Sequence, residues 1–125
     1  MKKILLVDDN EANITLLLGV LDELYDLSVA LSGEDALEAI EEEMPDLVIL
    51  DLRLGGISGI EVCKIIKQNE ATKHIPIIML TATSNTLQDE VYAAGADSLM
   101  SKPFEIAFLL NETRKLLNKD AVYKE

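Results

Sequence analysis

The sequence predicts a doubly wound α/β domain, a (βα)5 sandwich in which helices cover both faces of a parallel, five-stranded sheet. Short apolar runs of strand length alternate with amphipathic stretches of helix length along the 125 residues. Polar or charged residues follow four of these runs closely, as is typical of parallel strands that carry functional residues at their carboxyl ends. Because 49% of the residues are apolar and no repeat or linker interrupts the pattern, we expect one core.

Five runs of strand length follow one another, at residues 4–7, 27–31, 47–50, 77–80 and 98–100. The first, third and fourth are continuously apolar, as expected for strands inside a parallel sheet. The second and fifth are more polar and are expected at the edges. Since crossovers between parallel strands are right-handed, the order 2-1-3-4-5 is the simplest topology.

Apolar stripes and end signals mark the first two helices. The first stripe starts at Ile14 and recurs at helical spacing up to about Leu24. Ser32 can cap the second helix. Met44-Pro45 would end it, because the residue before a proline is disfavoured in the helical region.

Capping signals also predict the third and fourth helices. Ser58 to Glu61 forms a capping box, with Ser58 as the cap and Glu61 reaching back to it. The fourth helix is expected from about Thr86 to Gly95, since glycine suits a left-handed terminating position.

The fifth helix is expected to open just after Pro103, with Glu112 among the residues left for solvent. The domain is then expected to span residues 1–120, followed by a frayed tail at 121–125.

Composition excludes several classes of function. The chain has 23 acidic and 11 basic residues, a net charge of −12, which argues against direct contact with nucleic acid. No apolar stretch approaches the roughly 20 residues of a membrane span. A single cysteine, Cys63, excludes a disulfide framework within the chain and is expected to be buried in a helix. These features predict a cytoplasmic protein.

Five polar side chains are expected to meet at the carboxyl edge of the predicted sheet: Asp8, Asp9, Asp51, Thr81 and Lys102. At about 5 Å and an effective dielectric of about 20, each pair of carboxylates repels by roughly 3 kcal/mol. The lysine can offset only part of this repulsion. A hard divalent cation would offset the rest, and Mg²⁺ fits because it needs only a few carboxylates.

Each of these residues also has an ordinary structural interpretation. Asp8 or Asp9 could cap the first helix, Asp51 could be a turn residue, and Thr81 could be a β-branched strand end. Lys102 could be a solvated surface charge. The site hypothesis depends on all of them occurring together.

In their order and spacing, these segments resemble the receiver domains of two-component response regulators. The segments are Ile4 to Asn10, Leu47 to Leu52, Ile77 to Ala82, Ala94 to Asp97, and Lys102 to Phe104. The resemblance covers essentially the whole chain and implies a flavodoxin-like fold. It also implies a signalling switch, and not an enzyme beyond its own phosphorylation and dephosphorylation.

The resemblance implies that Asp51 accepts a phosphoryl group from a phosphohistidine. The donor would be a sensor histidine kinase or a histidine phosphotransfer protein. Asp8, Asp9 and Asp51, together with the backbone carbonyl of Arg53, would hold Mg²⁺.

Thr81 and Lys102 would each contact a phosphoryl oxygen, and the family holds Lys102 by a cis peptide bond to Pro103. The fourth helix, fifth strand and fifth helix would form the signalling face, through which a homodimer could form; the output partner is unknown. Two features depart from the family. Leu99 stands where many members have an aromatic residue, and the loop at 54–57 lacks the usual proline and contains two glycines.

The sequence allows three other interpretations. An inert receiver-like module would serve only for dimerisation or docking. A phosphatase similar to the haloacid dehalogenases would need a carboxylate two residues after Asp51, where Arg53 stands. A flavodoxin-like cofactor binder would need a phosphate cradle where Asp8 and Asp9 lie. Whether the receiver is free-standing or part of a larger regulator is left open.

Overall fold

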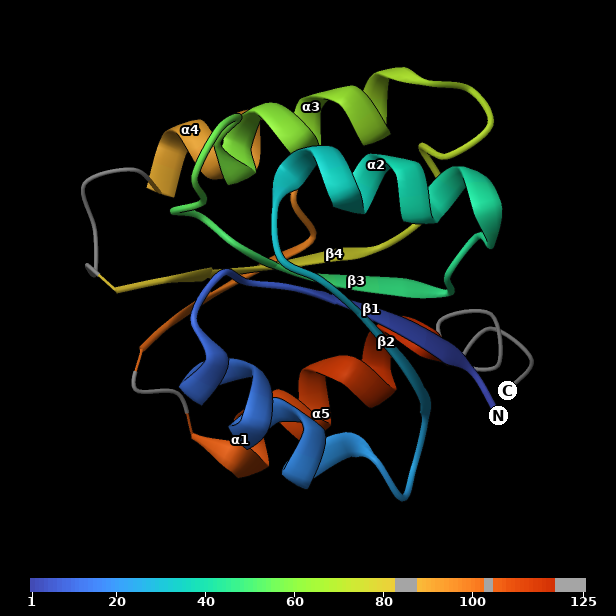
Figure 1. Ribbon diagram of the computed structural model, residues 1–125, viewed down its shortest axis with the longest axis vertical. Helices are drawn as coiled ribbons and strands as arrows, with labels where there is room; N and C mark the ends of the chain where they lie inside the picture. Colours follow the sequence, from blue (N-terminus) through green and yellow to red (C-terminus); the bar gives the residue numbers. More distant parts are fainter. Residues whose placement is uncertain (83–87, 103–104, 119–125) are drawn as a thin grey trace.

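The computed structural model describes residues 1–82, 88–102 and 105–118. In these ranges, five strands and five helices alternate along the chain. The strands form one parallel sheet in the order β2-β1-β3-β4-β5, which confirms the predicted topology (Figure 1).

The strands are β1 (Lys3–Val7), β2 (Asp26–Ala30), β3 (Leu47–Asp51), β4 (Ile77–Thr81) and β5 (Ser98–Ser101). Their register places Val7 beside Leu50, and Asp51 beside Leu80. The carboxyl ends of β1, β3 and β4 therefore lie at one edge of the sheet. The second strand starts and ends one residue earlier than predicted.

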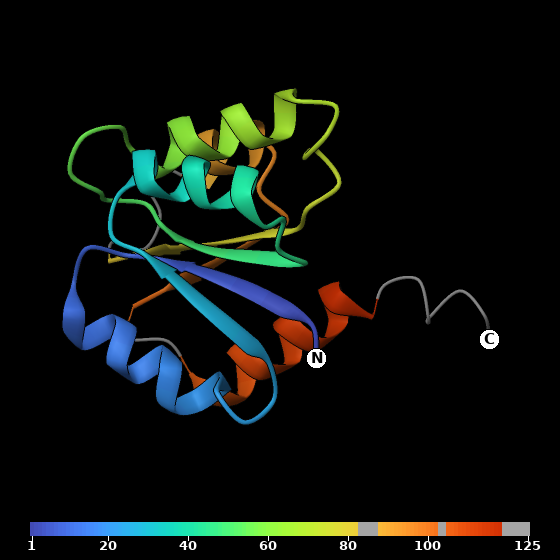
Figure 2. The ribbon, with the colours of Figure 1, turned by 45° about the vertical axis from the view of Figure 1, so that its right-hand side comes forward.

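The helices are α1 (Glu11–Leu21), α2 (Gly33–Glu42), α3 (Gly59–Gln68), α4 (Gln88–Ala93) and α5 (Ile106–Leu117). Helices α1 and α5 cover one face of the sheet, and α2, α3 and α4 cover the other (Figure 1, Figure 2). In the described ranges, no helix has the length and apolar content needed to span a bilayer.

Buried side chains form one core layer on each face of the sheet. Along β1, Leu5 and Val7 pack in the layer under α2, α3 and α4, whereas Ile4 and Leu6 pack in the layer with α1 and α5. Successive strand residues point to opposite faces, so a strand covered on both faces must be apolar throughout. This explains the continuous apolar runs of β1, β3 and β4.

Cys63 is buried in the layer of α3, as predicted. Its Sγ lies 3.6 Å from the carbonyl oxygen of Ala94. Burial raises the pKa of this thiol to about 11, so the reactive thiolate is disfavoured.

The predicted helix signals are largely confirmed. The hydroxyl of Ser32 accepts a hydrogen bond from the amide of Asp35, and that of Ser58 accepts one from Glu61. Gly95 has φ +107° and follows the end of α4, as expected of a left-handed terminating glycine. The predicted start of α4 at Thr86, Pro103 with its peptide bond, and the tail at 121–125 lie outside the described residues.

Two expectations about the helices are wrong. Helix α1 ends at Leu21, because the amides of Leu24 and Tyr25 both donate to the Leu21 carbonyl in a turn that leads into β2. Glu112 is not left in solvent: its side chain is 15% exposed and accepts a hydrogen bond of 3.0 Å from the Ser98 hydroxyl. Helix α5 therefore packs this polar side chain against β5.

At the amino-terminal edge of the sheet, away from the three carboxylates, Lys67 joins α3 to the starts of two strands. Its ammonium donates to the carbonyl oxygen of Ile75 at 2.7 Å and to Asp97 Oδ2 at 3.0 Å. The same Asp97 oxygen accepts from the amide of Ile77 at 2.9 Å. The end of α3 is thereby tied to the starts of β4 and β5.

Candidate functional site

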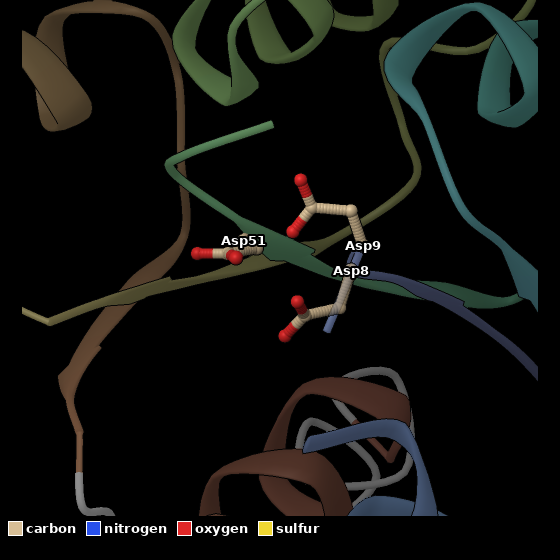
Figure 3. Close-up of side chains that lie close together, drawn as sticks. All are labelled: Asp8, Asp9 and Asp51. Atoms are coloured by element: carbon tan, nitrogen blue, oxygen red, sulfur yellow. The ribbon is translucent and has the colours of Figure 1, made fainter. Parts of the chain in front are cut away.

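Three carboxylates gather at the carboxyl edge of the sheet (Figure 3). Asp8 and Asp9 follow β1, and Asp51 is the last residue of β3. One oxygen atom from each side chain lies within 4.8 Å of the others. Asp8 is 1% exposed and Asp51 5% exposed, whereas Asp9 faces solvent. The predicted convergence of these three residues is confirmed.

The buried Asp8 is held by two asparagines. The amide of Asn10 donates to Asp8 Oδ1 at 2.9 Å, and the Asn13 side chain donates to Asp8 Oδ2 at 3.1 Å. Asn10 is also the cap of α1, because its side chain accepts from the Asn13 amide. The alternative in which Asp8 or Asp9 caps this helix is therefore wrong.

Sequence reasoning missed both asparagines as part of the site. Asn10 had a usable signal, since asparagine is a preferred N-cap residue and stands directly before α1. Asn13 had no such signal, because its side-chain amide comes close to Asp8 only once the first turn of α1 has formed.

Lys102 reaches two of the three carboxylates. Its ammonium lies 3.3 Å from Asp51 Oδ2 and 3.4 Å from Asp8 Oδ2, and its side chain is 18% exposed. The predicted pairing with Asp51 is confirmed, and the contact with Asp8 is additional. The backbone amide of Lys102 donates to the Thr81 carbonyl at 2.7 Å, which continues the pairing of β4 with β5 beyond Ser101.

Thr81 ends β4 next to the strand that carries Asp51, and it is buried. Ala82, which follows it, is exposed and lines the cleft over the carboxylates. All five residues predicted for the site are thus at the same edge of the sheet.

The protonation of Asp51 reflects its surroundings. Burial, and then the neighbouring charge of Asp8, raise the pKa of Asp51 from its ordinary 3.8 to about 6. The ammonium of Lys102 and a hydrogen bond of 3.3 Å from the Arg53 amide lower it, but less strongly. One ammonium therefore does not balance the clustered carboxylates.

An open cleft of about 370 Å³ lies over these groups. Residues that line it include Asp9, Asn13, Asp51, Arg53, Ala82 and Lys102. The cleft gives a ligand direct access to Asp51 from solvent.

The donor set fits Mg²⁺. Carboxylate oxygens are hard ligands, and Mg²⁺ holds oxygens at about 2.1 Å, so opposite ligands lie about 4 Å apart. The spacing of up to 4.8 Å among Asp8, Asp9 and Asp51 is close to this value. Such a cation would also favour the ionised form of Asp51, which burial disfavours.

Comparison with known proteins places the chain in a family. The family model of the response regulator receiver domain matches residues 4–114. The chain is 34% identical to response regulator PleD of Caulobacter vibrioides, over 98% of its own length and 28% of that protein. It is 46% identical to the alkaline phosphatase synthesis transcriptional regulatory protein PhoP of Bacillus subtilis, over 82% and 43% respectively.

One solved structure superimposes on nearly the whole chain. The CheY-like response regulator receiver domain protein of Methanospirillum hungatei JF-1 superimposes with a TM-score of 0.90 at 26% identity, and 98% of each chain is covered. Our chain spans less than half of the two curated relatives above. By its sequence, strand order and acidic edge, the chain belongs to the response regulator receiver domain family.

Proposed function

We propose that Asp51 is the residue that accepts the phosphoryl group in this receiver domain. The single observation that carries this assignment is the position of Asp51 at the end of β3, where it opens into the cleft within 4.8 Å of Asp8 and Asp9. Lys102 contacts the same carboxylate. Within the described residues, no other group of three carboxylates, histidines or cysteines lies this close together.

The ion is proposed to be Mg²⁺, held by Asp8, Asp9, Asp51 and the backbone carbonyl of Arg53. When bound, it would neutralise charge that develops on the transferring group. Asn10 and Asn13 orient the Asp8 carboxylate through their hydrogen bonds. Arg53 is supported by its place in the cleft wall, two residues after Asp51.

The transfer is a displacement at phosphorus. An oxygen of Asp51 forms the new P–O bond while the P–N bond of a phosphohistidine breaks, and the imidazole nitrogen keeps the electron pair. The donor is proposed to be a sensor histidine kinase or a histidine phosphotransfer protein. The domain thus promotes only its own phosphorylation and dephosphorylation, as a switch.

The switch is proposed to act through Lys102 and Thr81. Lys102 bridges Asp8 and Asp51, and a phosphoryl group on Asp51 would offer it stronger acceptors. Because the Lys102 amide is bonded to the Thr81 carbonyl, a shift of one residue displaces the other. The output is proposed to use the face of α4, β5 and α5, either for a partner or for a homodimer.

Leu99 bears on how this face responds. It is half-buried on β5 and packs against the core layer under α4. Without an aromatic ring at this place, we propose that the coupling relies on Lys102 and Thr81.

The direct test is phosphorylation of the purified protein. With Mg²⁺ and acetyl phosphate, intact mass spectrometry should show the addition of one phosphoryl group to the wild type and none to Asp51→Asn. Asp22→Asn, an exposed residue at the end of α1, is the matched control and should be phosphorylated normally. A wild type that stays unmodified would favour the inert docking module.

A further inference from the structure

The loop between β3 and α3 forms one wall of the cleft, through Arg53, Leu54 and Gly55. Its two ends are fixed by backbone hydrogen bonds. The amide of Leu52 donates to the carbonyl of Leu80 at 2.8 Å. The amide of Gly59 donates to the carbonyl of Leu52 at 3.0 Å. The middle of the loop has two adjacent glycines and no proline, so its order must come from elsewhere in the fold.

Glu34, in the first turn of α2, contacts this middle part. The backbone amide of Ile57 donates to Glu34 Oε2 at 3.3 Å. Gly56 has φ +78°, and a Cβ atom at that position would lie 2.8 Å from the same oxygen. The carboxylate of Glu34 therefore lies directly against the backbone of Gly56.

Gly33, the residue before Glu34, packs closely against the Ile57 side chain of the loop. A Cβ atom at Gly33 would lie only 2.6 Å from Cγ1 of Ile57. Two consecutive residues of α2 thus seat the same loop segment, one by close packing and one by a hydrogen bond. Figure 2 shows this loop bending beside the start of α2.

We propose that Glu34 is a positioning residue for the reaction at Asp51. By holding Gly56 and Ile57, it keeps the loop in the conformation that forms the cleft wall and from which the Arg53 carbonyl would bind the metal. Ordering a glycine-rich loop costs conformational entropy, and a loop that is already held binds its ion more tightly. This inference rests on the proposed function of the site.

Glu34→Ala is the primary test, with Asp35→Ala as the matched control. Both remove one exposed carboxylate from the first turn of α2, but in the described structure only Glu34 bonds to the loop. Glu34→Ala should raise the Mg²⁺ concentration for half-maximal phosphorylation by about threefold to tenfold, the range expected of one hydrogen bond. The rate at saturating Mg²⁺ should change much less.

Two further variants separate positioning from charge and from folding. Glu34→Gln keeps an oxygen that can accept from Ile57 and should restore most of the Mg²⁺ affinity. Gly55→Ala restrains the loop by another route, because Gly55 does not have a positive φ and a Cβ atom there meets no other atom within 4 Å. Glu34→Ala combined with Gly55→Ala should therefore recover part of the Mg²⁺ affinity.

Hydrogen exchange of the Ile57 amide provides a readout independent of phosphorylation. It should be faster in Glu34→Ala than in the wild type or Asp35→Ala. Equal exchange and equal Mg²⁺ affinity in Glu34→Ala and Asp35→Ala would overturn the proposal, as would a Glu34→Gln variant as defective as Glu34→Ala. If the wild type were not phosphorylated at all, the proposed function would fail, while exchange and Mg²⁺ binding would still decide the role of Glu34.

Discussion

The ammonium of Lys102 lies 3.4 Å from Oδ2 of Asp8, a residue 94 positions earlier in the chain. The strands that these residues follow, β1 and β5, are not neighbours, because β3 and β4 lie between them. This contact crosses the edge of the sheet above Asp51 and partly balances two buried carboxylates. Removing the ammonium of Lys102 therefore tests how much the charge balance of the site contributes to stability.

Lys102→Met should leave Asp8 and Asp51 without their cation. We expect the metal-free protein to lose about 1–3 kcal/mol of unfolding free energy, because buried charged groups lose a partner. The stabilisation by Mg²⁺ should increase, since the ion no longer competes with the ammonium. Urea unfolding with and without Mg²⁺ measures both effects. The exposed Lys115→Met is the control, and equal losses in the two variants would contradict the prediction.

The raised pKa of Asp51 predicts a pH dependence of stability. Because the folded state holds this proton more tightly than the unfolded state, the contribution is fully present below about pH 4 and is lost as the pH rises through about 6. In the presence of a metal chelator, the unfolding free energy of the wild type relative to that of Asp51→Asn should fall by about 1–3 kcal/mol over this pH range. Urea unfolding at several pH values measures it, and parallel profiles would refute it. Saturating Mg²⁺ should flatten the difference.

Asp9→Asn separates metal binding from folding. Asp9 is exposed, so the metal-free variant should be about as stable as the wild type. The stabilisation by Mg²⁺, about 2.7 kcal/mol for the wild type at 100 times its Kd, should largely disappear. Thermal unfolding across a Mg²⁺ titration tests this. Undiminished stabilisation in Asp9→Asn would remove this residue from the ligand set.

Lys67→Met tests a contact distant from the site. The variant leaves Asp97 and the Ile75 carbonyl without their shared donor, so we expect a loss of about 1–3 kcal/mol. Lys64→Met, an exposed position on the same helix, should change stability by less than about 0.5 kcal/mol. Chemical denaturation compares them. Mg²⁺ affinity should be the same in both variants, and a similar stability for the two would show that the Lys67 contacts contribute little.

The amino-acid sequence alone predicts the strand order and the sheet edge at which five residues meet: Asp8, Asp9, Asp51, Thr81 and Lys102. The reason is periodicity: apolar runs covered on both faces mark β1, β3 and β4, and parallel strands bring their carboxyl ends together. The helix caps at Ser32 and Ser58 were equally readable, because a cap depends on residues within one turn.

The side chains that support that edge are specified by the packing of the folded chain. Asn13 reaches Asp8, Glu34 reaches Ile57, and Glu112 pairs with Ser98. Glu34 with Ile57 and Glu112 with Ser98 join separate elements of the fold, and no local pattern specifies how closely two packed elements approach. A glutamate that contacts only solvent and a glutamate that holds a loop cannot be told apart in the sequence. The packing of the elements distinguishes them.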